Sequence, residues 1–244
     1  MAEFTIRIAG YTADVCSLFE STRDYCGKYL GEKPAQCHIT VTREDLDFEQ
    51  EFLRQEALEE GIKVRKFTDP FLERTAIQRK IADSLFDRDV LMTHGSTVAV
   101  DGKAYLFTAK CGTGKSTHTR LWRQVFESRA AMVNDDKPFL KITEAGVLAC
   151  GSPWSGKHGL DTNITVPLQG ICILERGKEN RIERIDPKEA LPMLLHQTHC
   201  PLAEGNRERF EILVSRLAEM TPLWRMECNM DPQAAEVSHS AMSK

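Results

Sequence analysis

Residues 109–117 read Ala-Lys-Cys-Gly-Thr-Gly-Lys-Ser-Thr, and this stretch decides the fold. It matches the pattern G-x-x-x-x-G-K-[ST] of a phosphate-binding P-loop, except that Ala109 replaces the first glycine. An apolar run at 104–108 precedes the stretch, and a helical pattern continues from it to about residue 126. A strand, a glycine-rich turn and a helix in direct succession predict an α/β fold that binds a nucleoside triphosphate.

The residue types of this loop suit a triphosphate. Gly112 and Gly114 let the backbone curve and approach phosphate oxygens closely, at the positive end of a helix dipole. Lys115 is expected to bridge the β- and γ-phosphates, and the Ser116 hydroxyl to ligate Mg²⁺. The simpler alternative is a glycine-rich turn with a solvated lysine. The predicted nucleotide-binding residues are Lys110, Cys111, Gly112, Thr113, Gly114, Lys115, Ser116 and Thr117.

An acidic pair follows the next predicted strand. Residues 130–133 are apolar, and Asn134, Asp135 and Asp136 come directly after them. In an α/β sheet the strand ends on the loop side form the ligand crevice, so one carboxylate can reach the metal and the other the attacking hydroxyl. Aspartate pairs are also common in ordinary turns, so this interpretation depends on the P-loop that precedes the pair.

Three motifs occur in a fixed order along the chain. His94-Gly95 comes first, the glycine-rich loop second, and the segment Val133-Asn134-Asp135-Asp136 third. This succession, within residues 90–185, resembles the catalytic domain of HPr kinase/phosphorylase. It is also similar to the wider group with a phosphoenolpyruvate-carboxykinase-like nucleotide fold, including small bacterial HPr-kinase-related proteins. The resemblance implies a P-loop core with a mixed sheet, ATP and Mg²⁺ as cofactors, and kinase activity.

The resemblance also implies individual roles. Asp135 would be the base that accepts the hydroxyl proton, which suits a carboxylate because the proton is transferred late as the acceptor bond forms. Asp136 would hold the metal together with Ser116, and His94 would lie beside the phosphates with Lys115. A histidine before a glycine is, without the resemblance, an ordinary turn residue.

Two departures from the HPr kinase pattern separate this chain from true HPr kinases. Thr117 stands where those enzymes usually carry an acidic residue, and their downstream glycine-rich segment has no counterpart here. The chain is also about half the length of full carboxykinases. We therefore expect a related kinase whose acceptor is a serine of a protein or peptide, or a small metabolite. The alternatives are a slow or non-catalytic nucleotide-binding accessory module and, less favoured, carboxykinase-type transfer to an enolate.

A second loop, at 151–158, combines small residues with a basic group and an aromatic ring. Such a loop could close over the phosphates or bind the acceptor, with Lys157 offsetting the charge of the transition state. The alternative is a surface turn with a packed tryptophan. The candidate acceptor-binding residues are Trp154, Ser155, Gly156 and Lys157.

The chain is expected to divide into an N-terminal α/β portion at 1–88 and the P-loop domain at 89–244. In the first portion strands are expected at 4–9 and 36–41 with helical segments between them, followed by a helix at 43–60, a turn at Asp69-Pro70 and a helix at 71–86. In the second, strands are expected at 91–93, 96–100, 104–108, 130–133, 140–142, 146–149, 171–175 and 182–185. Helices are expected from Gly114 to about 126, at 187–196 and at 206–219. The dipeptide Asp101-Gly102 predicts a hairpin turn.

Composition excludes several classes of partner. A net charge of -4 and a pI near 6.0 favour neither nucleic acid nor an anionic membrane. No run of about 18 apolar residues occurs, and the first residues lack a signal-peptide pattern, so a cytoplasmic location is expected. The eight cysteines are scattered without metal-ligand spacing and are expected to be reduced thiols. The oligomeric state stays open.

Overall fold

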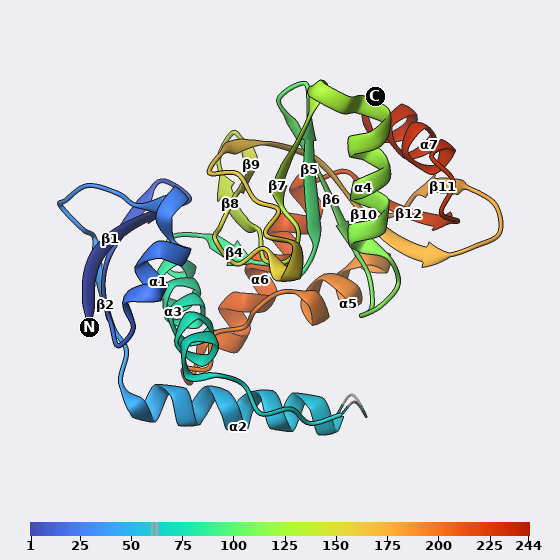
Figure 1. Cartoon of the computed structure of the whole chain (residues 1–244). Helices are drawn as coiled ribbons and strands as arrows, with labels where there is room; N and C mark the ends of the chain where they lie inside the picture. The colour runs from blue at the N-terminus through green and yellow to red at the C-terminus, as the bar shows by residue number, and fades with distance from the viewer. Residues whose placement is uncertain (60, 62) are drawn as a thin grey trace. The chain divides into compact units, whose positions relative to one another are not determined.

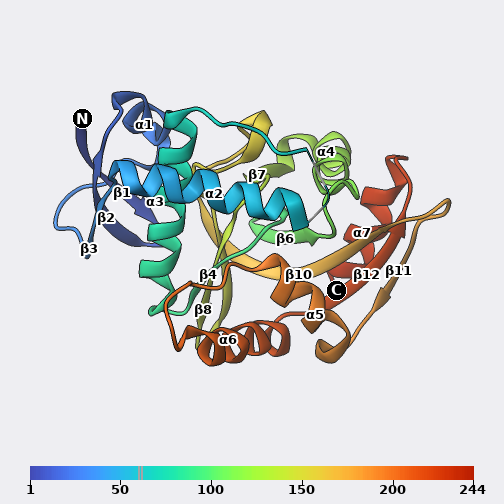
Figure 2. The same ribbon diagram turned by 90° about the horizontal axis from the view of Figure 1, so that it is seen from below.

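The computed structural model describes residues 1–59, 61 and 63–244, which form two compact units at 1–87 and 88–244. Each unit has its own sheet and its own helices (Figure 1), and Figure 2 shows the same elements from below. The unit boundary lies one residue before the expected one. The last residue of the helix expected at 43–60 lies outside the described residues.

The N-terminal unit is built on a three-stranded sheet in the described part of the chain, in the order β1-β2-β3. Its strands are β1 (Ala2–Ile8), β2 (Tyr11–Ser17) and β3 (Cys37–Thr40). Its helices are α1 (Glu20–Tyr25), η1 (Gly27–Tyr29), α2 (Arg43–Glu59) and α3 (Asp69–Phe86). β2 pairs antiparallel with β1 and parallel with β3. The helix α1 confirms the helical character expected between the first two predicted strands, whereas β2 contradicts it, because residues 11–17 pair with β1 instead. Helix α3 begins at the Asp69-Pro70 pair, where a turn was expected.

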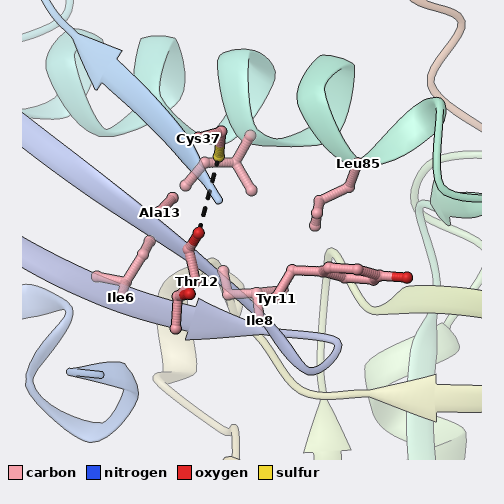
Figure 3. Close-up of a pocket in the computed structure, with 8 residues that line it drawn as sticks. Ile6, Ile8, Tyr11, Thr12, Ala13, Cys37 and Leu85 are labelled. Carbon is pink, nitrogen blue, oxygen red and sulfur yellow. Dashed lines mark hydrogen bonds between the residues drawn. The ribbon is translucent and has the colours of Figure 1, made fainter. Parts of the chain in front are cut away.

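The core of the N-terminal unit lies between this sheet and α3 (Figure 3). Ile6 and Ile8 of β1 and Leu85 of α3 are each less than 4% exposed. A gap of about 10 Å³ remains among them, and the Cys37 thiol donates to the Thr12 carbonyl oxygen at 4.0 Å beside it. The gap is too small to hold a ligand, so this region is packed core.

The C-terminal unit contains a larger sheet. Its strands are β4 (Val90–Met92), β5 (Ser96–Val100), β6 (Lys103–Thr108), β7 (Ala130–Asn134), β8 (Phe139–Thr143), β9 (Gly146–Cys150), β10 (Thr165–Arg176), β11 (Arg181–Arg184) and β12 (Leu223–Cys228). Its helices are α4 (Lys115–Phe126), η2 (Glu127–Arg129), η3 (Gly156–His158), α5 (Pro187–Gln197), α6 (Asn206–Met220) and α7 (Gln233–Met242). The other predicted elements are confirmed with small shifts of their ends, but β10 begins six residues before the strand expected at 171–175, and β12 and α7 were not predicted.

The sheet of the C-terminal unit is mixed, with β10 at its centre. Over the described residues the strand order is β4-β8-β9-β10-β6-β5-β7, and β11 and β12 join beside β10. β10 runs parallel to β6 and β12, and the other pairs are antiparallel. Figure 2 shows α4 on one side of β6 and β10 and the α5–α6 pair on the other. The α/β class with a mixed sheet is therefore confirmed.

Helix α4 is held against the sheet and against α7. The Trp122 ring is fully buried, lies 5.3 Å from the Phe107 ring of β6, and donates its Nε1–H to Ser238 Oγ of α7 at 2.9 Å. Ser238 Oγ also lies 3.1 Å from His118 Nε2. These contacts fix the orientation of α4, and with it the loop that precedes the helix. Across the described residues, no helix combines the length and the apolar character that a bilayer crossing requires.

Candidate functional site

The 109–117 loop connects β6 to α4, as the sequence predicted. Gly112 and Gly114 have φ of 74° and 122°, a backbone region that other residues rarely adopt, so both positions require glycine. Ala109, which replaces the first glycine of the motif, is fully buried and does not have a positive φ. Alanine can therefore occupy that position without changing the path of the loop.

The N-terminus of α4 is open toward the loop. No side chain among the described residues caps it, and its first turn contains no acidic residue. The first N–H groups of a helix have no intrahelical acceptor, so they can bind an anion here. Lys115 Nζ donates to the Ala109 carbonyl oxygen at 3.2 Å, which folds the ammonium back over the loop. Burial lowers the pKa of Lys115, while the charges of Asp136 and Asp135 oppose that shift.

Asp135 is held by hydroxyl groups from two neighbouring elements. Its carboxylate Oδ1 accepts a hydrogen bond from Ser96 Oγ of β5 at 2.6 Å, and Ser96 Oγ lies 2.7 Å from Thr119 Oγ1 of α4. The residue is 8% exposed. No hydrogen bond to its second oxygen, Oδ2, is found in the part of the chain that the structure describes. One oxygen is thus fixed and the other is available to a ligand.

Asp136 lies beside His94. The distance from His94 Nε2 to Asp136 Oδ1 is 3.4 Å, and the Gly95 N–H donates to the Asp136 carbonyl oxygen at 3.0 Å. Burial lowers the pKa of His94 to about 3, and the nearby Lys137 and Lys115 charges add to this shift. Burial also raises the pKa of Asp136. The structure therefore brings together His94, Asp136 and Lys115.

The glycine after His94 has a packing role. A Cβ at Gly95 would lie 2.5 Å from Leu106 Cδ1 and 3.1 Å from the Phe107 carbonyl oxygen. Only glycine lets the chain pass so close to β6. This close contact places His94 at the sheet edge where the 109–117 loop begins. It explains why a glycine follows the histidine.

Asn134 organises the acidic turn, a role that sequence reasoning missed. Its side-chain Oδ1 accepts from the N–H groups of Asp136 at 2.8 Å and Lys137 at 2.6 Å. Its Nδ2 donates to the Ser152 carbonyl oxygen at 2.8 Å and to Ser152 Oγ at 3.0 Å. Asparagine directly before an aspartate pair was the available signal, because Asn side chains commonly bond to the backbone two residues on. The turn is thereby tied to the second loop.

The four candidate acceptor residues of the 151–158 loop differ in how far they are exposed. Trp154 is 6% exposed, with its ring 6.4 Å from the Phe139 ring, and Ser155 is 2% exposed and donates to Asp161 Oδ1 at 2.7 Å. Gly156 and Lys157 are exposed. A Cβ at Gly156, where φ is 67°, would lie 3.3 Å from the Cβ of Asp136. Of the four candidate acceptor residues, Trp154 and Ser155 belong to the packed base of the loop, Gly156 is accessible beside Asp136, and Lys157 is exposed.

Lys137 is a second lysine of the site that sequence reasoning did not single out. Its charge lowers the pKa of His94, Asp136 and Lys115. Its backbone is locked, because its carbonyl oxygen accepts from Ser152 Oγ at 2.7 Å in addition to the N–H contact with Asn134. No partner of its ammonium is found among the described residues. A half-exposed cation near the Asp136 carboxylate and a second lysine is suited to an anionic ligand.

The residues that could hold a divalent cation are few. The described residues contain no group of three or more His, Cys, Asp or Glu side chains placed to bind a metal. Ser116 at the start of α4 and Asp136 at the end of β7 offer oxygen ligands. This donor set fits Mg²⁺, which prefers oxygen and usually takes one or two protein ligands together with phosphates and water.

No protein-family model matches the chain, and no curated protein matches it in sequence. Among solved structures, the chain is similar to the HPr(Ser) kinase/phosphatase from Coxiella burnetii. The two share 12% sequence identity, with 62% of this chain and 95% of that chain covered and a TM-score of 0.36. Similarity of this size carries no functional argument, so the function must be argued from the side chains of the site.

Proposed function

We propose that this protein is an ATP- and Mg²⁺-dependent kinase that transfers the γ-phosphoryl group to a hydroxyl. One observation carries the proposal. The start of β5 lies opposite the ends of both β6 and β7, with Ser96 opposite Phe107 and Thr97 opposite Asn134, so the loop that leads to Lys115 and the Asp135-Asp136 pair leave the sheet at the same edge. A cationic anion-binding loop and a carboxylate pair therefore lie at the same edge of one sheet, where phosphoryl transfer needs them.

The loop binds the triphosphate in this proposal. The first-turn N–H groups of α4 and the N–H groups around Gly112 and Gly114 donate to phosphate oxygens. The Lys115 ammonium bridges the β- and γ-phosphates, and Lys137 adds a positive charge beside them. The transition state carries charge mainly on the γ-phosphoryl oxygens, so fixed cations and N–H groups stabilise it without reorganisation.

Asp135 acts on the acceptor. Its Oδ1 is fixed by Ser96, and its Oδ2 accepts the hydrogen bond of the acceptor hydroxyl. As the bond from the hydroxyl oxygen to the γ-phosphorus forms and the bond from that phosphorus to the ADP oxygen breaks, the hydroxyl proton passes to Asp135. Ser116 and Asp136 would hold the Mg²⁺, which neutralises phosphate charge when it is bound.

The acceptor is a serine of a protein or peptide, or a small hydroxyl-bearing metabolite. Gly156, which is exposed next to Asp136, and the exposed Lys157 that follows it would contact the acceptor. The net charge of -4 favours neither nucleic acid nor a membrane surface as partner. We place the activity in the cytoplasm on the same sequence grounds.

The test is Mg²⁺-dependent transfer of label from γ-labelled ATP into an extract of the source cells. Lys115→Ala should weaken ATP binding at least about tenfold, because it removes a charged hydrogen-bonding group. Asp135→Asn should lower transfer at least about a hundredfold and leave ATP binding nearly unchanged. Lys103→Ala is the matched control, since Lys103 is an exposed lysine at the other end of β6.

The outcomes are separable. Loss of labelling in Lys115→Ala and Asp135→Asn, but not in Lys103→Ala, supports the kinase and identifies its acceptor. Unchanged transfer in Asp135→Asn removes that residue from the mechanism. Tight ATP binding by the wild type with no label transferred would instead favour a nucleotide-binding accessory module.

A further inference from the structure

Arg176 reaches the 109–117 loop from the end of β10. In the parallel pairing of β10 with β6, Ile173 is the partner of Thr108, the last residue of β6, so β10 continues alongside the loop. The Arg176 guanidinium donates from Nη2 to the Gly112 carbonyl oxygen at 2.5 Å and from Nε to the Thr113 carbonyl oxygen at 3.5 Å. It therefore holds two consecutive carbonyl groups at the tip of the loop.

The direction of these carbonyl groups fixes the direction of the N–H groups that follow them. In a planar trans peptide the C=O and the next N–H point to opposite sides. When Arg176 holds the carbonyls of Gly112 and Thr113, the N–H groups of Thr113 and Gly114 point away from it. The Thr113 N–H closes the loop by donating to the Lys110 carbonyl oxygen at 3.3 Å, which leaves the Gly114 N–H for a ligand.

Without such a contact the loop would have a wide choice of conformations. Two of its residues are glycines, and glycine has more backbone freedom than any other residue. A guanidinium is planar, always charged and able to donate to two acceptors at once, whereas an ammonium is a single point. Arginine is thus the side chain best suited to hold neighbouring carbonyls in one arrangement.

The charge of Arg176 is also unneutralised. No carboxylate pairs with it in the described part of the chain. Other arginines nearby do have such partners, because Arg181 pairs with Glu179 at 2.5 Å and Arg225 lies 3.6 Å from Glu175. An exposed, unpaired guanidinium beside the loop adds positive potential where a triphosphate would lie.

We propose that Arg176 is a positioning residue, which latches the 109–117 loop so that its N–H groups are ready for the nucleotide phosphates. This role rests on the proposed kinase function, because it presumes that the loop binds a triphosphate. It acts through the backbone of the loop and needs no contact with the transferred phosphoryl group. ATP affinity should therefore depend on Arg176 more strongly than the rate of the bound complex does.

The experiment compares wild type, Arg176→Met, Arg176→Lys and the matched control Arg181→Met. In nucleotide-free protein, amide hydrogen exchange over residues 109–114 and the alkylation rate of Cys111, followed by peptide mass spectrometry, report loop order. Cys111 is exposed, so its labelling is sensitive to movement of the loop. Calorimetry with Mg-ATP gives affinity, and initial rates separate KM from kcat.

Arg176→Met should raise loop exchange and Cys111 alkylation about fivefold and raise the Kd and KM for ATP about fivefold, with kcat within about twofold. Arg176→Lys should show smaller increases in these four quantities, and Arg181→Met should match wild type in all of them. Unchanged loop exchange or unchanged ATP affinity in Arg176→Met overturns the proposal that Arg176 holds the 109–117 loop in place. A wild type that does not bind ATP overturns the proposed function, and the latch with it.

Discussion

The Nε2 atom of His94 lies 3.4 Å from Oδ1 of Asp136, the carboxylate that we propose as a metal ligand. Burial keeps the pKa of His94 at about 3, so the ring is neutral at pH 7 and the contact is not an ion pair. A neutral ring can donate its Nε2–H to the carboxylate and orient it. His94 therefore adds no positive charge of its own at this site.

His94 should remain uncharged over the range in which an ordinary histidine titrates. We expect its ring resonances in the nucleotide-free protein to stay constant from pH 8 to pH 5, because protonation would bury an additional charge near Lys115 and Lys137. NMR of the folded chain checks this, with His94→Gln used to assign the signal. The urea-unfolded chain is the control and should titrate near the usual pKa of about 6.5. A folded-state midpoint near that value would contradict the burial argument.

The central strands and the loop of the C-terminal unit could be predicted because their sequence signals are local. The runs at 96–100 and 104–108, the Asp101-Gly102 turn and the helix after Gly114 appear as β5, β6, their hairpin and α4. The turn residues have φ of 51° and 79°, as this type of hairpin requires. Local backbone preference and apolar pattern agree in this part of the chain.

The missed elements depend on distant partners. β12 carries Arg225 and Glu227 between apolar residues, yet it pairs with β10 and β11 and so lies within the sheet. α7 is short, with only ten residues of mixed character, and it is stabilised by the bond from Trp122 to Ser238, which are 116 residues apart. No local pattern encodes contacts at that separation.

In the candidate site, too, contacts between residues distant in sequence could not be predicted. The acidic pair and the lysine could be predicted from their order, but the tie from Asn134 to Ser152 joins separate loops. The bond from Arg176 to Gly112 spans 64 residues. Burial of Trp154 depends on Phe139. These relationships follow from strand pairing, which the sequence specifies only through the whole fold.

Ser96 should matter for transfer because it holds Asp135. Ser96→Ala removes the hydroxyl that donates to Asp135 Oδ1 at 2.6 Å, and a lost hydrogen bond to a charged group costs about 1.5–3 kcal/mol. We expect kcat to fall about tenfold with little change in the KM for ATP. Steady-state rates with the identified acceptor measure this.

The neighbouring Thr97 provides the matched control for Ser96. Its hydroxyl is also fully buried on β5, but it has no hydrogen-bond partner among the described residues. Thr97→Val should therefore leave kcat unchanged and should not reduce stability. Equal losses in the two variants would show that a general disturbance of β5, and not the bond to Asp135, lowers the rate.

Lys137 should contribute to catalysis through its charge. Lys137→Met keeps the length of the side chain and the locked backbone but removes the ammonium beside Lys115 and Asp136. We expect kcat/KM to fall about tenfold to a hundredfold, the size typical of one lost charged contact. Lys178→Met, which removes an exposed lysine elsewhere in the C-terminal unit, is the control. Rates equal to wild type in both variants would exclude Lys137 from the site.

His118 should make the stability of the C-terminal unit depend on pH. It is 2% exposed, its Nδ1 has no hydrogen-bond partner among the described residues, and burial lowers its pKa to about 4. An unfolded histidine has a pKa of about 6.5, so below that pH the unfolded chain binds a proton that the folded chain excludes. The free energy of unfolding should therefore fall by about 2 kcal/mol between pH 7 and pH 5 from this residue alone.

Urea unfolding followed by tryptophan fluorescence tests this, because Trp122, Trp154 and Trp224 all belong to the C-terminal unit. His118→Gln should be less stable at pH 7, since it disturbs the packing beside Ser238 and Trp122, but it should lose about 2 kcal/mol less than wild type on acidification. The exposed His158 gives the control, and His158→Gln should retain the wild-type dependence on pH. If the free energy of unfolding of His118→Gln fell between pH 7 and pH 5 as much as that of wild type, other groups would be responsible for the acid sensitivity.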